Sequence, residues 1–384
     1  MKKKIVISLF IISLIVMVVQ TGYGQFRSLL PQNRLKNSAI WDLSYSNGFL
    51  INNESASGGK FTDDAGYNGF RFQVGFRKNN LSDLYNQLYR LPVFGIGWES
   101  DIFHDKAIGN IHSLYFYYSI PVIFEQSSRF SFSYTGSLGI SYNQNQNDWY
   151  DNPLALMIGA YGNSILHTGV NIDYHPNPFW VIYASLGVKY LSNGSLSQPQ
   201  NGLALFPITV GLKYKPTGFF TDKKDKSLPK FIKYNMFNVG LSAGSRNVLP
   251  GEANFLSSAF EVNWMRMFSY KIRAGAGAEL YYVTGSKTRS PDGKSGFSTA
   301  FSYAGLAVAE WVLSSRLSVP LAFGYYIGRN EFNGEEKPYF ERVGLKYYLG
   351  NRIYTGINIK AHGIRTDNFQ ITVGYTFRKD ENRY

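Results

Sequence analysis

The sequence contains no cysteine, few charged residues and no long hydrophobic run beyond its N-terminus. Without cysteine, disulfide bonds, cysteine-ligated zinc sites and a lipid anchor on cysteine are excluded. Charged residues make up 17% of the chain, and soluble domains usually carry roughly 25%. After residue 24, no stretch approaches the roughly eighteen apolar residues of a membrane-spanning helix. The chain is therefore neither a disulfide scaffold nor a bundle of transmembrane helices.

The N-terminus has the pattern of a secretory signal peptide. Lys2 to Lys4 form a basic head, and Ile5 to Val19 form an apolar run that is too short for a transmembrane helix. Gly22 and Gly24 place small residues before a cleavage site. We therefore expect residues 1–24 to be a signal peptide cleaved near Gly24, so that the protein is exported.

The net charge of +13 does not indicate a nucleic-acid partner. Three of the lysines belong to the basic head, and the other cations are scattered apart from a cluster between Lys223 and Lys233. Binding of nucleic acid would need a coherent basic face. Contact with anionic lipid headgroups and solubility of the loops are the two uses that we expect for this charge.

Apolar residues alternate with small or hydroxyl-bearing residues along much of the chain. The alternation is clear over 130–142, 180–189 and 371–378, and about sixteen segments of roughly ten residues share it. Aromatic residues, at 17% of the chain, collect at the ends of these segments, and long connections alternate with short ones. This combination favours a membrane barrel, with lipid outside, over a soluble sandwich. We predict an all-β fold, a transmembrane antiparallel β-barrel of about sixteen strands.

A basic segment divides the exported chain. Residues 216–231 are rich in lysine and bounded by prolines, and we interpret them as a linker on the periplasmic side. The chain then consists of an N-terminal barrel half over 25–215 and a C-terminal half over 232–384. One sixteen-stranded barrel and two eight-stranded barrels fit the pattern equally well.

One hairpin resembles a known enzyme family. The stretches Tyr190 to Gly194, Gln198 to Gly202 and Ala204 to Pro207 are similar to the outer-membrane lipid A deacylases, the PagL-like or acyloxyacyl hydrolase group of Gram-negative bacteria. The family pattern there is His-x-Ser-Asn, a Pro-Asn stretch and an acid on the next strand. Other stretches that look like longer members of the family are Tyr89 to Trp98, Asn143 to Ala160 and Lys360 to Asp367.

The resemblance implies a serine esterase that removes an acyl chain from lipopolysaccharide. Ser192 matches the nucleophile, and backbone N–H groups around Asn193 and Gly194 would form the oxyanion hole. The histidine position is occupied by Tyr190 and the acid position by Ala204. A tyrosine with a pKa near 10 is a poor general base. The same fold without esterase activity, as a structural or lipid-binding barrel, and a passive channel remain as alternatives.

The strand parity of this hairpin predicts where the patch lies. Tyr190 and Ser192 are two residues apart and share a face with Trp180 and Leu186, which we expect to contact lipid. Pairing Ser192 with Ala204 would gather the three side chains at the extracellular rim, beside the acyl chains of the outer leaflet. In this register His167 would lie opposite residue 186, about 20 Å from Ser192.

The remaining polar residues are interpreted as lumenal networks. We expect Glu99 and Asp101 to pair with lumenal lysine or arginine, and His362 with Asp367 to form a lumenal pair. Glu341, Arg342 and Lys346 are further candidates for such networks. The spacing of histidine and carboxylate residues predicts no metal site, and no cofactor is expected. The expected partners are outer-membrane lipid, lipopolysaccharide and the barrel-assembly machinery during insertion.

Overall fold

The computed structural model describes most of the chain beyond residue 38. The described residues are 39–51, 66–77, 81–104, 109–122, 129–143, 160–198, 202–217, 228–249, 251–289, 300–335, 337–363 and 365–378. The predicted signal peptide and most of the predicted linker lie outside these ranges. Among the described helices, none has the length and apolar character to cross a membrane.

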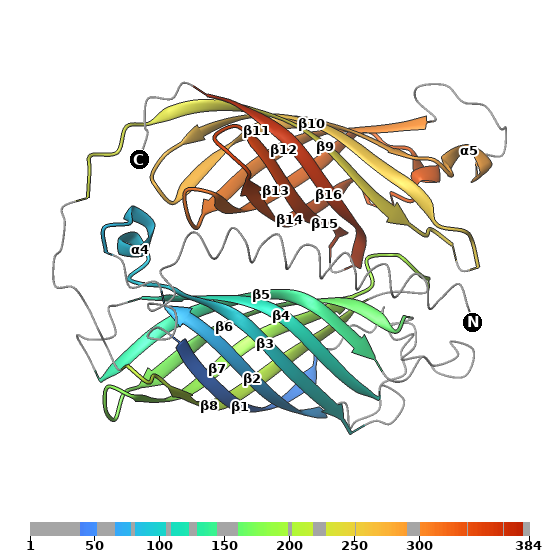
Figure 1. Ribbon diagram of the computed structural model, residues 1–384. Helices are drawn as coiled ribbons and strands as arrows, with labels where there is room; N and C mark the ends of the chain where they lie inside the picture. Colours follow the sequence, from blue (N-terminus) through green and yellow to red (C-terminus); the bar gives the residue numbers. More distant parts are fainter. Residues whose placement is uncertain are drawn as a thin grey trace.

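The chain forms two closed antiparallel barrels of eight strands each (Figure 1). The strands of the first barrel are β1 (Ala39–Leu50), β2 (Gly66–Arg77), β3 (Val93–Phe103), β4 (Asn110–Pro121), β5 (Phe130–Asn143), β6 (Gly162–Tyr174), β7 (Trp180–Ser192) and β8 (Leu203–Tyr214). The strands of the second are β9 (Tyr234–Arg246), β10 (Phe255–Met267), β11 (Ile272–Val283), β12 (Phe301–Val312), β13 (Leu317–Gly328), β14 (Tyr339–Tyr348), β15 (Ile353–His362) and β16 (Arg365–Arg378). Of the two arrangements left open by the sequence, the structure adopts two barrels.

Each barrel closes by pairing its last strand with its first. In the first barrel β8 pairs with β1, and in the second β16 pairs with β9. Within the described ranges, three short helices lie in connections: α4 (Leu84–Leu88), α5 (Ser286–Arg289) and the 3-10 helix η3 (Glu331–Asn333). The longest connections, such as β5–β6 and β11–β12, lie at one end of each barrel, which we name the extracellular end; the opposite, periplasmic end carries mainly short turns and the long β2–β3 connection with α4.

Both barrels carry apolar side chains on the outside and polar side chains in the interior, the reverse of soluble proteins, as predicted. On β7 the burial alternates strictly from Trp180 to Lys189, with apolar side chains exposed on the outer face. Phe116, on β4, is 74% exposed, and Ile371, on β16, is 64% exposed. The inward positions carry buried serine, threonine, asparagine and charged residues. A lipid-facing wall and a polar interior account for this alternation.

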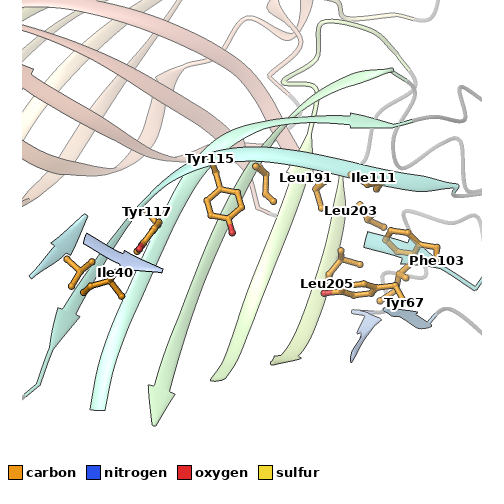
Figure 2. Packing of buried hydrophobic residues seen from close by; sticks show 12 residues of the cluster. Ile40, Tyr67, Phe103, Ile111, Tyr115, Tyr117, Leu191, Leu203 and Leu205 are labelled. Atoms are coloured by element: carbon orange, nitrogen blue, oxygen red, sulfur yellow. The ribbon is translucent and has the colours of Figure 1, made fainter. Parts of the chain in front are cut away.

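The interior of the first barrel has an apolar layer at the extracellular end and a charged layer beneath it. Figure 2 shows buried side chains of the apolar cluster, which includes Tyr67, Phe103, Ile111, Leu191, Leu203 and Leu205. Below them, Lys189 Nζ lies 2.7 Å from Glu99 Oε1 and 2.8 Å from Asp101 Oδ2. The predicted pairing of these two carboxylates with a lumenal cation is therefore confirmed.

The second barrel closes its extracellular end with a loop. Residues 329–335 fold inward around η3, and Arg246 Nη1 and Nη2 donate to the carbonyls of Asn333 and Gly334 at 2.6 and 2.7 Å. Arg246 also forms an ion pair with Asp367. Asn330 N–H donates to Ser302 Oγ at 3.0 Å. We call residues 329–335 the lid.

Lower in the second barrel, one arginine bridges two carboxylates, and one carboxylate binds two cations. Arg342 contacts both Glu261 and Glu279, as the predicted network requires. Arg273 and Lys346 share Glu310. Glu341 was expected to join such a network, but its carboxylate accepts the N–H of Gly363 instead, because its position on β14 alternates with the inward-facing Arg342.

Candidate functional site

The predicted site lies on the outer face at the extracellular end of β7 and β8. Tyr190 and Ser192 share the outer face of β7, as their parity predicts. The register is two residues away from the predicted one, because Ala204 pairs with Tyr190 and not with Ser192. Across the other edge of β7, Ser192 pairs with Ser164 of β6. The three side chains thus lie near one another, with Ser192 beyond the last pair of the hairpin.

The patch is covered by the second barrel. Ser192 is only 1% exposed, and Asn193 likewise. Thr366 Oγ1, at the start of β16, donates to the Tyr190 hydroxyl at 3.3 Å. Ser195 Oγ donates to the carbonyl of the same Thr366 at 3.1 Å. Lipid was expected over this patch, but the hairpin of β15 and β16 occupies the place instead.

Backbone and side-chain contacts strengthen this junction. Asn247 N–H donates to the Ser195 carbonyl at 2.6 Å, and Arg365 Nη2 donates to Gln198 Oε1 at 3.2 Å. Gly194 has φ +63°, and a Cβ there would lie 1.9 Å from the ring of Phe369. Only glycine combines this left-handed backbone with such a close approach. The loop 193–198 is therefore shaped to fit the second barrel, and we call this contact the extracellular junction.

The groups expected to form an oxyanion hole stabilise the turn. The N–H of Gly194 donates to Ser192 Oγ at 3.0 Å, a local serine turn. The Asn193 side chain donates to the Ser197 carbonyl at 2.9 Å. An oxyanion hole needs donors aimed at the position of a substrate oxygen. In this conformation the Gly194 N–H, one of the expected backbone donors, points to Ser192 Oγ of the protein itself.

All five histidines belong to the described residues, and each is placed away from Ser192. His167 faces the lumen opposite Lys189, not residue 186 as predicted, since the hairpin register differs. His362 also faces the lumen, with Nδ1 3.7 Å from Asp367 Oδ1, which confirms the predicted pair. His112 stacks on the ring of Trp98. His104 lies beside Asn68, and His175 lies beside Ser131 at the periplasmic end.

The barrel lumens offer little room for a substrate. Each holds a cavity of about 40 Å³, lined in the first barrel by residues such as Asp42 and Arg71 and in the second by residues such as Glu310 and Arg342. Side chains fill an eight-stranded barrel of this kind. Among the described residues, no group of three or more histidine and carboxylate side chains could hold a metal ion.

The sequence did not reveal Thr366, Phe369 and Asn247 as parts of the site. The stretch from Lys360 to Asp367 was singled out for its family resemblance, but nothing in it indicated contact with Tyr190. The two hairpins are nevertheless equivalent by topology, since β7 and β8, like β15 and β16, are the last two strands of a barrel. The extracellular junction therefore joins corresponding hairpins of the two barrels.

Comparisons with known proteins point to the second barrel. Residues 235–379 match the family described as acyloxyacyl hydrolase, C-terminal domain. No curated protein matches the chain.

Among solved structures, the outer membrane enzyme PagL is similar at 12% identity, over 45% of this chain and 98% of PagL, with a TM-score of 0.30. Neisserial surface protein A is similar at 9% identity, over 46% of this chain and 96% of that protein, with a TM-score of 0.30. An outer membrane channel from Pseudomonas putida F1 is similar at 9% identity, over 91% of this chain and 97% of the channel, with a TM-score of 0.20.

The family match covers β9 to β16 almost completely, whereas the candidate nucleophile Ser192 lies in the first barrel. The second barrel presents Ile359, Ala361 and Phe369 on the outer face of the equivalent hairpin. The second barrel of this transmembrane β-barrel protein is therefore the part that matches the acyloxyacyl hydrolase family, as its C-terminal domain.

Proposed function

We propose that this chain is a non-hydrolysing member of its family, which contacts lipid A acyl chains with its outer walls and does not cleave them. The observation that supports this best is the burial of Ser192 beside the residues that contact the second barrel. Attack on an ester requires the carbonyl carbon to come within about 3–3.5 Å of the nucleophile. At 1% exposure, Ser192 offers no such approach in this conformation.

The residues around Ser192 also lack the chemistry of an esterase. Tyr190 stands where the family has its histidine, and its hydroxyl accepts a hydrogen bond from Thr366. Ala204, at the acid position, carries no ionisable group. Without a base, the serine hydroxyl is a weak nucleophile near neutral pH. The outer face of the last hairpin of the second barrel carries Ile359, Ala361 and Phe369, none of which is a base or a nucleophile.

The outer walls supply the surface for acyl chains. Apolar side chains on the outer face of both barrels are exposed to about half or more, including Leu186 and Ile371. Hydrocarbon chains are the natural neighbours of such a surface at membrane depth. The protein would therefore contact the same lipid as the enzymes of its family but would not hydrolyse it.

Lipid A from a Gram-negative host that expresses the protein tests the absence of hydrolysis. We expect mass spectra of lipid A to be the same for the native protein, the Ser192→Ala variant and an empty vector. A heat-dependent gel shift of the barrel verifies that the protein is folded. Loss of an acyl chain that Ser192→Ala abolishes would restore the esterase interpretation and reject ours.

Photo-crosslinking tests the contact with lipid. A photoreactive amino acid at position 371, which faces outward, should capture lipid A in cells, whereas the same group at the neighbouring Thr372, 2% exposed, should not. Capture of only phospholipid at position 371, or equal capture at both positions, would contradict the proposed contact.

A further inference from the structure

The two barrels meet a second time at the periplasmic end, through the connection between β2 and β3. Tyr89, directly after α4, donates its hydroxyl proton to the carbonyl of Val312 at 2.5 Å. Its ring meets the ring of Trp311 edge-on at 6.3 Å, and it packs with Ile120 and Leu313 in one buried cluster. Figure 1 shows α4 beside both barrels, at the end opposite to α5. This contact fixes α4 against the second barrel.

Two cations from different barrels meet at this contact. Arg90 follows Tyr89, and Lys271 comes from the turn between β10 and β11. Lys271 Nζ lies 4.9 Å from the centre of the Tyr89 ring, which stabilises it in part. Burial and the charge of Arg90 lower the pKa of Lys271, so the two positive charges repel each other. Asp83, the acid next to α4, accepts the N–H groups of Tyr85 and Asn86 as the helix cap.

The backbone around Arg90 is strained. Arg90 has φ 54° and Leu91 has φ 61°, a left-handed conformation that is unfavourable for residues other than glycine. Their N–H groups donate to Gln87 and Asn86 and end the helix. Leu91 is buried, whereas Arg90 remains partly exposed. The strained turn thus presents the arginine side chain at the boundary between the barrels.

Further lysines lie beside the same turn. The ring of Phe231 meets the ring of Tyr270 edge-on at 4.8 Å, and Tyr270 donates its hydroxyl proton to the Pro229 carbonyl at 3.3 Å. These contacts place residues 228–233 against the β10–β11 turn, with Lys230 and Lys233 exposed. We name Arg90, Lys230, Lys233 and Lys271 the basic corner.

Apolar side chains adjoin the basic corner on the membrane side. Ile272, directly after Lys271, is 53% exposed, and it pairs across the sheet with Trp311, which is 38% exposed. Phe268, before the turn, is also exposed. Cations at headgroup depth beside aromatic and aliphatic side chains at acyl depth match the two parts of a phospholipid.

We propose that the basic corner binds the phosphate headgroup of an anionic phospholipid from the periplasmic leaflet, with its acyl chains along Ile272 and Trp311. The bound phosphate relieves the repulsion between Arg90 and Lys271. The site is independent of the proposed lipid A contact, because lipid A belongs to the opposite leaflet. It would make one phospholipid part of the contact between the barrels.

Native mass spectrometry of the full-length protein from detergent tests this site. With phosphatidylglycerol and phosphatidylethanolamine added in equal amounts, we expect preferential retention of phosphatidylglycerol. The double variant Arg90→Gln with Lys271→Gln should retain it roughly tenfold to thirtyfold less. The matched control changes Arg129 and Arg352 to Gln, which are exposed cations of other periplasmic turns, one on each barrel, and should retain the lipid as the native protein does.

Thermal unfolding separates lost binding from a damaged fold. In lipid-free detergent the double variant should unfold at the same or a higher temperature than the native protein, because a like-charge contact is gone. Added phosphatidylglycerol should raise the unfolding temperature of the native protein and not of the variant. Equal retention by the double variant and the native protein, or no preference for phosphatidylglycerol, would overturn the proposal whatever the result for lipid A.

Discussion

The two barrels close their extracellular ends by different means. In the first, strand side chains such as Tyr67, Leu191 and Leu205 meet in an apolar layer. In the second, the lid folds into the mouth and depends on Arg246, which binds two carbonyls of the lid and the carboxylate of Asp367. An apolar layer is held by many small contributions, whereas a polar lid is held by a few hydrogen bonds and one buried cation.

The charged layers of the two barrels are built alike. In the first barrel Lys189 stands between Glu99 and Asp101, with Arg71 3.6 Å from Glu99. In the second barrel Arg342 stands between Glu261 and Glu279 in the same way. The two barrels therefore share a buried cation between two carboxylates and differ in how their extracellular ends are closed.

The largest effect is expected from Lys189→Met in the first barrel. This change leaves two fully buried carboxylates beside each other, and breaking a buried pair in this way costs about 3–5 kcal/mol of stability. Urea unfolding in detergent micelles, followed by tryptophan fluorescence, measures the loss. Lys213→Met is the matched control, because Lys213 Nζ also binds a carboxylate, Asp173, at 2.7 Å but is 18% exposed. Equal losses for both variants would refute the difference that we infer.

A smaller, pH-dependent effect is expected at the lid. Burial raises the pKa of Glu335 to about 7, while the charges of Lys360 and Arg246 oppose the shift. The folded lid therefore binds the proton more tightly than the open lid does, so its stability is greatest below about pH 4.5 and falls as the pH rises through 7. The difference amounts to roughly 3 to 4 kcal/mol for a pKa change of this size.

Hydrogen exchange of residues 329–335 at pH 5 and pH 8, corrected for the intrinsic rates, measures this dependence. Glu335→Gln should remove most of it. Glu331→Gln should leave it unchanged, because Glu331 is 73% exposed and pairs with Arg329 at the surface. If the lid of the native protein were equally protected from exchange at both pH values, Glu335 would not control the pH dependence of the lid.

The sequence predicts the face of almost every strand residue but not the closure of the barrels. Alternation along β7 gives the outward side of Tyr190 and Ser192 because strand side chains alternate strictly. Closure depends on backbone pairing between β8 and β1, and between β16 and β9. Backbone pairing leaves no side-chain signature that would distinguish one large barrel from two small ones.

At the candidate site too, the sequence predicts the face of each strand residue but not the pairing or the long-range contacts. In the β7–β8 hairpin Ala204 pairs with Tyr190, two residues from our expectation, and Gly194 and Gly202 of the connecting loop have positive φ angles that the sequence does not specify. The second barrel reaches the candidate site through Thr366 and Phe369, which approach Tyr190 and Gly194 from more than 170 residues away in the chain. Contacts between apolar outer walls and loops at such separation have no periodicity that could predict them.

The smallest effect is expected at the extracellular junction, from Tyr190→Phe. Tyr190 accepts one hydrogen bond from Thr366 at 3.3 Å, so its removal should cost about 0.5–1.5 kcal/mol of stability. Gly194→Ala should cost more, because the added methyl group meets the ring of Phe369 and the backbone has φ +63°. Thermal unfolding of both variants ranks them, and Gly251→Ala provides the control, since its φ is also positive but its Cβ position is open. If Gly194→Ala cost no more than Gly251→Ala, the strain of the backbone alone would explain the loss, and Phe369 of the second barrel would not approach Gly194 as closely as we infer.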